Sequence, residues 1–571
     1  MSKRKKPAAS STKRTGSGDH SLPVLPRWLI FTSAAALLVL FAGLTLWEMS
    51  GDAPTSDERI HLPVGYAYWK AKEFRLNPEH PPLVKLLCSA PLLLMDLKMP
   101  SIDPDSIAMS YPRGDKLPEE YYKYNAFQQG FGSQFLFTQD ADRILFWGRL
   151  PVVGLGLLLC WFVFRWSWQL HGHPGAGLLS LFLVALEPSV LAHSHYVTTD
   201  VALACFSVMA MFFLWKFSRE GQLRHFVLAS LGLALALASK FSGVFLAPVF
   251  FFLAFVMWPK GGVRSGGLLF TGESVKARLV AFAAATVGIA VVVQASYLFS
   301  PNLGLYYRGL RSVNINHIEG FPSYVHGRFF PGGVWWYSLY ALLVKTPIPT
   351  LLIIGAAVGG LLGRREGRNR EVLFALLPAA VYAVAVCAFA DNLGVRYMIP
   401  VTVFLLVLAG RLFFSLAGSR GGKISGAVLA LWLALSVLRG SPYHIAYFNE
   451  LVGGAENGPY FLNDSNIDWG QDLKRLVQYM QEQGVREPIL SYWGPGPPEY
   501  YEECCGVTFK PWTRAMAASA QPPPGVYAIS VNNLVALEQP GQDNPNLDWL
   551  RRFQPADRIG YSIYIYRFPK N

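Results

Sequence analysis

Long apolar runs are the feature of this sequence that most limits how the chain can fold. A run of about 20 apolar residues can cross a bilayer as one helix, because the hydrocarbon layer is about 30 Å thick. The chain is 52% hydrophobic and only 15% charged, unlike a soluble globular protein. Candidate runs occur at residues 27–47, 143–166, 175–193, 200–216, 225–241, 242–258, 277–297, 337–361, 372–390, 397–415 and 424–440. We therefore predict a mainly α fold, with a polytopic transmembrane helical domain of about 11 spans over residues 27–440.

Two apolar segments have more than one interpretation, and a third is too short to cross the membrane. Residues 27–47 could be a cleaved signal peptide, but the run is long and no clear A-x-A site follows, so we expect a retained anchor. Residues 225–258 are too long for one crossing and have basic flanks, which favours a hairpin turning at Phe241-Ser242-Gly243 over one tilted helix. The stretch Leu83–Leu94 is too short to cross and is expected at the membrane interface.

The placement of lysine and arginine predicts the orientation of the spans. The net charge of +13 could suggest nucleic acid, but the basic residues lie in short loops between apolar runs, which is a topology signal. The loop at His171–His173 is the exception, being poor in Lys and Arg. The basic loops that agree with one orientation are 216–224, 260–278, 364–370 and 420–423. This orientation puts a disordered basic tail, residues 1–26, in the cytoplasm, and the loops 50–142 and 298–336 on the outer face.

Residues 441–571 are predicted to form a small soluble α/β domain on the same outer face. Their pattern predicts a helix at Gln471–Gln483 and short strands near Ile489–Trp493, Val526–Val531 and Tyr561–Phe568. The six cysteines of the chain follow no metal or disulfide spacing. Cys504 and Cys505 are adjacent, and the sequence leaves open whether they are ordinary, reactive or paired.

Ionisable residues at span ends and in the outer loops are the candidates for function. Each one alone is explained by a helix cap or by a lysine that reaches from the membrane edge to water. Charged groups near the membrane are costly, however, and all of these fall on one side in the predicted topology. The set comprises Asp57, Glu58, Glu79, His80, Lys85, Asp200, Lys240, Lys345 and Arg396.

Such a mixture of charges is suited to the chemistry of a lipid phosphate. Cations such as Lys240, Lys345 and Arg396 could bind the phosphate, which is the anion naturally present at that depth. If the lipid carries a sugar, a phosphate leaving group needs only charge balance, and one carboxylate can act as base for an acceptor hydroxyl. His80, His193 and Glu79 could instead hold a divalent metal ion, although their spacing fits no strong metal signature. No cofactor is otherwise indicated.

Six segments resemble the C superfamily of glycosyltransferases. The closer resemblance is to dolichyl-phosphate-mannose protein mannosyltransferases and to the bacterial aminoarabinose lipid A transferase. It covers about residues 27–440, and the paired acidic motifs are its most specific part. The segments are DERIHLPVGYAYW at Asp57–Trp69, NPEHPPLVKLL at Asn77–Leu87, AHSHYVTTDVAL at Ala192–Leu203, ALASKFSG at Ala236–Gly243, VKTPIP at Val344–Pro349 and GVRYMIPV at Gly394–Val401.

The resemblance implies a role for each candidate residue. Asp57 would be the catalytic base, and a polyprenyl-phosphate sugar would be the donor, with inversion at the transferred sugar. The acceptor would be a hydroxyl of a protein, a lipid or a glycan, and the site would face outward from a bacterial plasma membrane. Residues expected to bind acceptor or sugar are Glu58, Glu79, His80 and Asp200. Residues expected to bind the donor phosphate are Lys85, Lys240, Lys345 and Arg396.

The sequence leaves open the role of the tail and two alternative functions of the protein. YFNELVGG at Tyr447–Gly454 and DSNIDWGQDL at Asp464–Leu473 resemble only the tails of uncharacterised bacterial relatives. Within the second segment, Asp468, Trp469 and Gln471 could contact the acceptor, or Asn466 or Asp468 could cap the following helix. A transporter of lipid-linked sugars is the main alternative, but the sequence has no internal repeat. A non-enzymatic scaffold that displays the tail would leave the charged residues at the membrane edge unexplained.

Overall fold

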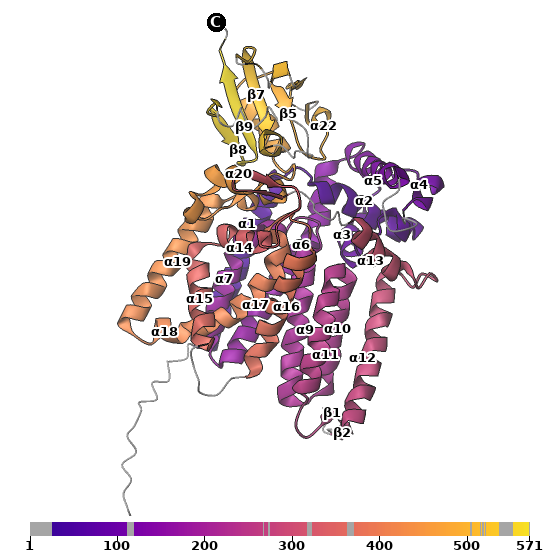
Figure 1. Ribbon diagram of the computed structural model, residues 1–571, viewed down its shortest axis with the longest axis vertical. Helices are drawn as coiled ribbons and strands as arrows, with labels where there is room; N and C mark the ends of the chain where they lie inside the picture. Colours follow the sequence, from indigo (N-terminus) through magenta and orange to yellow (C-terminus); the bar gives the residue numbers. More distant parts are fainter. Residues whose placement is uncertain are drawn as a thin grey trace, which may run out of the picture.

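The computed structural model describes residues 26–110, 119–265, 268–271, 274–316, 323–362, 370–502, 505–513, 515–516, 519, 521–535 and 552–569 (Figure 1). The predicted cytoplasmic tail lies outside the described residues except for Pro26, and so does Cys504. The described chain is a bundle of apolar helices with a small sheet above one end (Figure 1). The protein is a polytopic helical membrane protein.

Every predicted apolar run is helical. Among the described residues, seven helices are long and apolar enough to cross a membrane, or eight if a bent pair counts as one span. The helices that cover the runs are α1 (Arg27–Gly51), α6 (Ala141–His171), α7 (Pro174–Ala185), α8 (Pro188–His193), α9 (Asp200–Glu220), α10 (Leu223–Ser239), α11 (Leu246–Val256), α12 (Val275–Ser296), α14 (Tyr337–Lys345), α15 (Ile348–Leu362), α16 (Leu373–Phe389), α17 (Ile399–Ala409), α18 (Phe413–Ala417) and α19 (Arg420–Gly440).

Residues 225–258 are divided as predicted, and two runs that are predicted as single spans are also divided, 175–193 between α7 and α8 and 337–361 between α14 and α15. Residues 225–258 divide into α10 and α11 around a 3-10 turn at Phe241–Phe245, at the predicted place. The run 337–361 is predicted as a single span, but the chain bends by 116° between α14 and α15. Pro347 and Pro349 explain the bend, because proline lacks a backbone N–H and disfavours helix in the residue before it.

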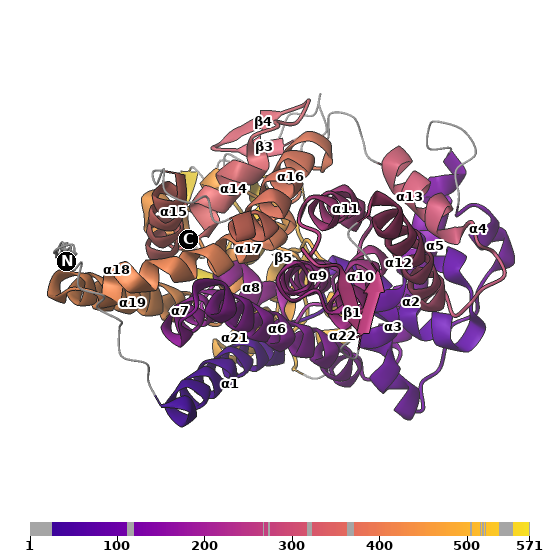
Figure 2. The same ribbon diagram turned by 90° about the horizontal axis from the view of Figure 1, so that it is seen from below.

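The bundle is packed around α9. Helices α6, α10 and α17 contact it from different sides, and Figure 2 shows α9 in the middle of the assembly. Five shorter helices cover the end nearest the sheet, at the upper right of Figure 1. These are α2 (Ser56–Ala71), α3 (Leu83–Ser89), α4 (Pro104–Ala108), α5 (Glu119–Phe137) and α13 (Leu305–Asn316). The described part of the polar chain between α1 and α6, together with α13 from a later loop, therefore forms a layer at that end of the bundle.

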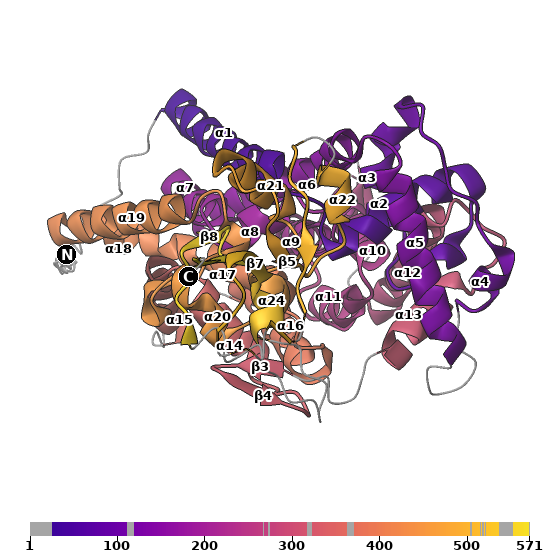
Figure 3. The ribbon, with the colours of Figure 1, turned by 90° about the horizontal axis from the view of Figure 1, so that it is seen from above.

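The tail carries a five-stranded sheet, which lies over the middle of the bundle and beside the layer of short helices when viewed from above (Figure 3). The strand order is β6-β5-β7-β9-β8, with β5 parallel to its neighbours and β9 antiparallel to its own. The elements are β5 (Ile489–Ser491), β6 (Lys510–Pro511), β7 (Gly525–Ser530), β8 (Asp557–Ile559), β9 (Ile563–Phe568), α20 (Gly458–Phe461), α21 (Leu473–Glu482), α22 (Pro498–Glu502) and α24 (Val531–Val535). Three strands and α21 lie where the sequence predicts them.

The N-terminus of α21 differs from the prediction. Its N-cap residue is Asp472, and neither Asn466 nor Asp468 caps the helix. The reason is that both side chains are used elsewhere. Asn466 Oδ1 accepts a hydrogen bond from the backbone N–H of Val395, and Asp468 Oδ1 accepts one from Gly470.

Two small hairpins mark opposite ends of the bundle. The hairpin of β3 (Ser323–Val325) and β4 (Arg328–Phe330) lies near the tail. The hairpin of β1 (Val263–Ser265) and β2 (Leu268–Thr271) follows α11 at the far end from the sheet (Figure 1). The described parts of 260–278, at this hairpin, and residues 420–423, where α19 begins after α18, lie away from the tail (Figure 1), as the predicted orientation requires.

Cysteine labelling will test this orientation. Gly421, in the first turn of α19 among the basic residues 420–423, and Gln521, in the tail, are both exposed in the structure. In a cysteine-free background, we expect an impermeant thiol reagent added to intact cells to label cysteine at 521 and not at 421. Permeabilised cells should show labelling at both positions, as the control. Labelling at 421 alone in intact cells would reverse the orientation.

Candidate active site

Asp57 stands in the first turn of α2 because a capping box begins that helix. The backbone N–H of Thr55 donates to Glu58 Oε2 at 3.0 Å, and the Thr55 side chain completes the box with the Glu58 backbone. An acidic residue in a first turn is also favoured by the helix dipole. The Asp57 carboxylate accepts a hydrogen bond at 2.8 Å from Nη1 of Arg396, which precedes α17.

Asp200 begins α9, and two cations reach its carboxylate. Lys240, which ends α10, places Nζ 2.6 Å from Asp200 Oδ1. Arg396 Nη1 lies 3.8 Å from Asp200 Oδ2 and therefore touches both carboxylates. Asp57, Asp200, Lys240 and Arg396 thus meet at one place, and we call them the charged cluster.

Two aromatic rings border the charged cluster. Lys240 Nζ lies 4.2 Å from the centre of the Tyr397 ring. The guanidinium carbon of Arg396 lies 4.4 Å from the centre of the ring of Trp469, which comes from the tail. Both contacts are close enough for a cation–π interaction. The cations are therefore held by aromatic faces as well as by carboxylates.

The charges around Asp57 keep it ionised. Burial alone would raise its pKa, but Arg396 and the other nearby cations outweigh that effect, so the pKa of Asp57 lies below its ordinary value. Its side chain is 27% exposed, whereas that of Asp200 is 2% exposed. Asp57 is therefore the more accessible carboxylate of the charged cluster.

His80 and Lys85 lie beside the charged cluster and have different surroundings. The His80 ring is 5.6 Å from the His61 ring, and burial lowers the pKa of His80 well below its usual value. Lys85 Nζ donates to the backbone oxygens of Asn77 and His80 at 2.9 and 3.1 Å. Burial also lowers the pKa of Lys85 to about 7. Lys85 thus stabilises the loop that carries His80, because its side-chain nitrogen donates hydrogen bonds to the backbone of that loop.

Glu58 is directed to a different partner from Asp57. Arg149, from within α6, forms a bidentate ion pair with it, with both N–O distances 2.8 Å, and Glu58 Oε1 also accepts from the Val197 backbone. Glu58 is completely buried in this pair. A direct contact with the acceptor, as the resemblance implied, does not fit this geometry, because the carboxylate is already occupied and inaccessible.

Lys345 also has partners outside the charged cluster, and these belong to the tail. Its Nζ donates to the backbone oxygens of Ile445 and Asn466 at 2.7 and 2.5 Å, and it lies 4.3 Å from the centre of the Phe448 ring. This lysine ties the end of α14 to the tail. Glu79, the remaining candidate, is half-buried next to His80. Over the residues that the structure describes, no group of three or more His, Cys, Asp or Glu side chains is arranged to hold a metal ion.

The sequence interpretation missed Arg149 and Tyr397. Arg149 lies inside an apolar run, and an arginine in a predicted span is itself a signal of a buried partner. Tyr397 follows Arg396 directly and carried no signal of its own, because aromatic residues are common at membrane interfaces.

A further buried network joins Asp52 to His195, Tyr196 and Arg475 of the tail.

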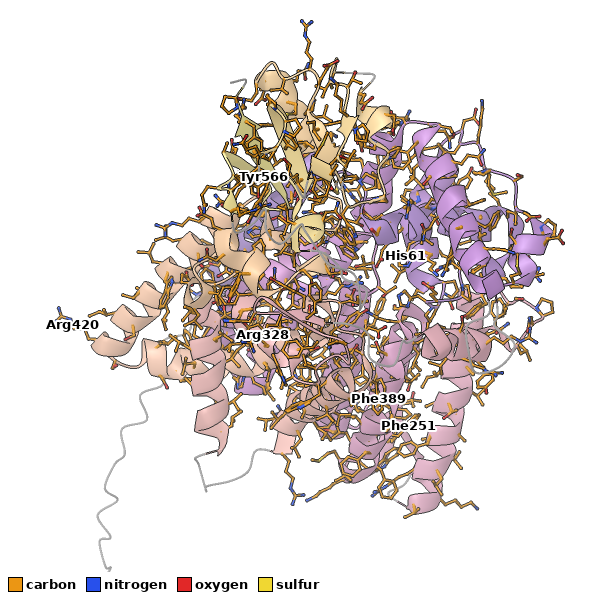
Figure 4. The ribbon with its side chains drawn as sticks, turned by 45° about the horizontal axis from the view of Figure 1, so that its top comes forward. His61, Phe251, Arg328, Phe389, Arg420 and Tyr566 are labelled. Atoms are coloured by element: carbon orange, nitrogen blue, oxygen red, sulfur yellow. The ribbon has the colours of Figure 1, made fainter. Side chains whose placement is uncertain are left out.

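A pocket of about 210 Å³ opens beside the charged cluster. Lys240, His80, Asp391 and Tyr397 give it a polar end. Its other walls come mainly from apolar side chains of the 3-10 turn after α10 and of α16, and these include Phe241, Phe245, Val386 and Phe389. Figure 4 labels Phe389, which lines this pocket, and His61, whose ring is the neighbour of the His80 ring. A molecule with an anionic head and an apolar chain would match such a lining.

Residues 130–299 match the family model described as dolichyl-phosphate-mannose-protein mannosyltransferase. A comparison with curated proteins finds no match. Among solved structures, the chain is similar to ArnT from Cupriavidus metallidurans bound to undecaprenyl phosphate, with 12% identity, a TM-score of 0.44 and coverage of 95% of this chain and 98% of that one. It is also similar to the oligosaccharyltransferase of Archaeoglobus fulgidus, with 12% identity, a TM-score of 0.39 and coverage of 85% and 64% respectively.

Proposed function

We propose that this chain, a membrane glycosyltransferase by its resemblance to the C superfamily, transfers a sugar from a polyprenyl-phosphate donor to a hydroxyl group. The observation that carries this proposal is the charged cluster, where two carboxylates and two cations from four chain segments meet beside an apolar pocket. Residues 27–440 would form the transferase domain and residues 441–571 an outer domain. The site would face outward from the plasma membrane.

The proposed reaction needs one base and a charge-balanced leaving group. Asp57 takes the proton of the acceptor hydroxyl while the oxygen attacks the anomeric carbon. The bond from that carbon to the phosphate oxygen breaks, and the polyprenyl phosphate leaves with the electron pair. Lys240 and Arg396 stabilise the extra negative charge on that phosphate. Attack from the face opposite the leaving group inverts the anomeric centre.

The exposure of the two carboxylates supports Asp57 as the base. Asp200 is almost fully buried and lies 2.6 Å from Lys240, so its carboxylate serves to hold that cation. Asp57 is more accessible and is paired through only one nitrogen of Arg396. A donor phosphate that draws Arg396 toward itself would weaken this pair and add negative charge nearby. Both effects raise the basicity of Asp57 once the donor is bound.

The pocket beside Lys240 supports the choice of a lipid donor. Its polar end would take the phosphate, with Lys240 and Tyr397 closest, and the start of the polyprenyl chain would lie along Phe245 and Phe389. A soluble nucleotide sugar would gain nothing from those apolar walls. The acceptor would approach Asp57 from the side of α2.

Substitution of Arg396 will test the donor site. We expect Arg396→Ala to weaken the binding of polyprenyl phosphate and also to slow transfer, since it removes a cation from both the bound donor and the leaving group. A loss of about tenfold to a hundredfold in kcat/KM corresponds to a charge-assisted contact. The measurements are binding of the lipid in detergent and transfer from a polyprenyl-phosphate sugar.

A matched substitution controls for loss of charge alone. Arg411→Ala removes a half-buried arginine from the opposite end of α17 and should leave both measurements unchanged. Unaltered transfer by Arg396→Ala would remove this residue from the mechanism. If no polyprenyl-phosphate sugar is turned over while lipid-linked sugar crosses proteoliposomes, the protein is a transporter.

A further inference from the structure

The tail reaches the charged cluster through a short segment that the proposed reaction does not use. We call residues 463–472 the tail loop. Its residue Trp469 is buried, and one face of the ring lies 4.4 Å from the guanidinium carbon of Arg396. The rings of His193 and Tyr196 contact Trp469 edge-on, each at 5.9 Å between centroids. Trp469 is therefore wedged between Arg396 and the segment that leads into Asp200.

The tail loop also holds the backbone beside Arg396. Asn466 is completely buried, and its Oδ1 accepts a hydrogen bond of 3.0 Å from the backbone N–H of Val395. Its Nδ2 donates to the hydroxyl of Tyr337 at 2.9 Å. The tail loop thus contacts both the side chain of Arg396 and the backbone of the preceding residue, Val395.

The tail loop is itself fixed by internal bonds and by the chain just before Asp57. The backbone N–H of Trp469 donates to Gln471 Oε1 at 2.8 Å, and Gln471 Nε2 donates to the Ile467 oxygen at 2.9 Å. The backbone N–H of Ala53 donates to the Gln471 oxygen at 2.8 Å. The tail loop is therefore held in place and links the chain just before α2 to Arg396.

We infer that Trp469 is a positioning residue that orients Arg396 for the donor phosphate. The inference rests on the proposed function. A guanidinium group is planar, and its N–H donors point outward in that plane. An aromatic ring that covers one face leaves those donors free to reach both Asp57 and a phosphate, and it restricts how the plane can rotate. The tail is then a structural part of the transferase site, although it contributes no reacting atom.

Graded substitution of Trp469 separates this role from simple packing. In the full-length protein, Trp469→Leu removes the π face and Trp469→Phe keeps a smaller one. We expect Trp469→Leu to weaken binding of polyprenyl phosphate about 5- to 30-fold, and Trp469→Phe to weaken it only about 2- to 3-fold, following the strength of cation–π contacts. Trp432→Leu is the control, because Trp432 lies on α19 and bonds to Glu450, away from the charged cluster.

A double-mutant cycle decides whether Trp469 acts through Arg396. In an Arg396→Ala background, Trp469→Leu should cause no further loss of polyprenyl-phosphate binding. An equal loss in both backgrounds, or equal losses from the Phe and Leu variants, would overturn the inference. The same cycle is measured on thermal unfolding without lipid, where coupling between Trp469 and Arg396 is expected. If the wild type neither binds nor transfers the lipid, the proposed function fails, and the unfolding cycle alone decides whether Trp469 holds Arg396.

Discussion

Asp57→Asn is expected to lower the transfer rate by about 10²- to 10⁴-fold, the usual contribution of a general base. The amide has the same shape as the carboxylate, so α2 and its capping box should persist. It cannot accept a proton from the acceptor hydroxyl at neutral pH. Donor binding should be retained or become tighter, because Arg396 loses its partner at 2.8 Å and becomes more available to phosphate. The measurements are transfer from a polyprenyl-phosphate sugar and lipid binding by the same preparation.

The pH dependence provides a second measure of Asp57. Its pKa lies below the ordinary value in the free protein, so the carboxylate is fully ionised at neutral pH and is protonated only as the pH falls well into the acid range. The wild-type rate should therefore decline on the acid side, and the residual rate of Asp57→Asn should lack that decline. Near wild-type transfer by Asp57→Asn would assign the base to another group, with Asp200 as the first candidate.

Arg149→Met is expected to destabilise the fold by about 3–5 kcal/mol, because it leaves the carboxylate of Glu58 buried without its partner. Arg149 also donates to the backbone oxygens of Met49, Asp52 and Ala53, and so joins the end of α1 to the start of α2. Glu58→Gln should cost less, and the double variant should recover part of the loss from Arg149→Met. The free energy of unfolding in mixed micelles measures each effect.

A surface ion pair provides the matched control. Lys474 and Asp142 lie 2.7 Å apart with exposed side chains, so Lys474→Met should change the free energy of unfolding by less than about 1 kcal/mol. The alternative, implied by the family resemblance, is that Glu58 binds the acceptor. In that case Glu58→Gln would raise the KM for the acceptor while the stability of the protein stays unchanged.

The sequence alone determined the features of the fold that depend on local chemistry. In the described chain, eight of the eleven predicted runs match helices long enough to cross a membrane, if the bent pair counts as one, and the break near Lys240 followed from a run too long for one crossing. Alternating patterns in the tail located β5, β7 and β9. The cost of a charge near the membrane identified nine candidate residues, and four of them, Asp57, Asp200, Lys240 and Arg396, meet in the charged cluster. The orientation of the bundle is a prediction that labelling can test.

Only the tertiary structure decided which charges pair with one another. Glu58 follows Asp57 directly, yet it pairs with Arg149 inside the bundle while Asp57 pairs with Arg396. Lys85 and Lys345 are lysines like Lys240, but their side-chain nitrogens donate to backbone oxygens and not to a carboxylate of the charged cluster. The tail loop reaches Arg396 across a separation in sequence that no local pattern encodes. The physical reason is that an ion pair or a ring contact acts over a few ångströms, so its partner is chosen by how distant helices pack and not by neighbours along the chain.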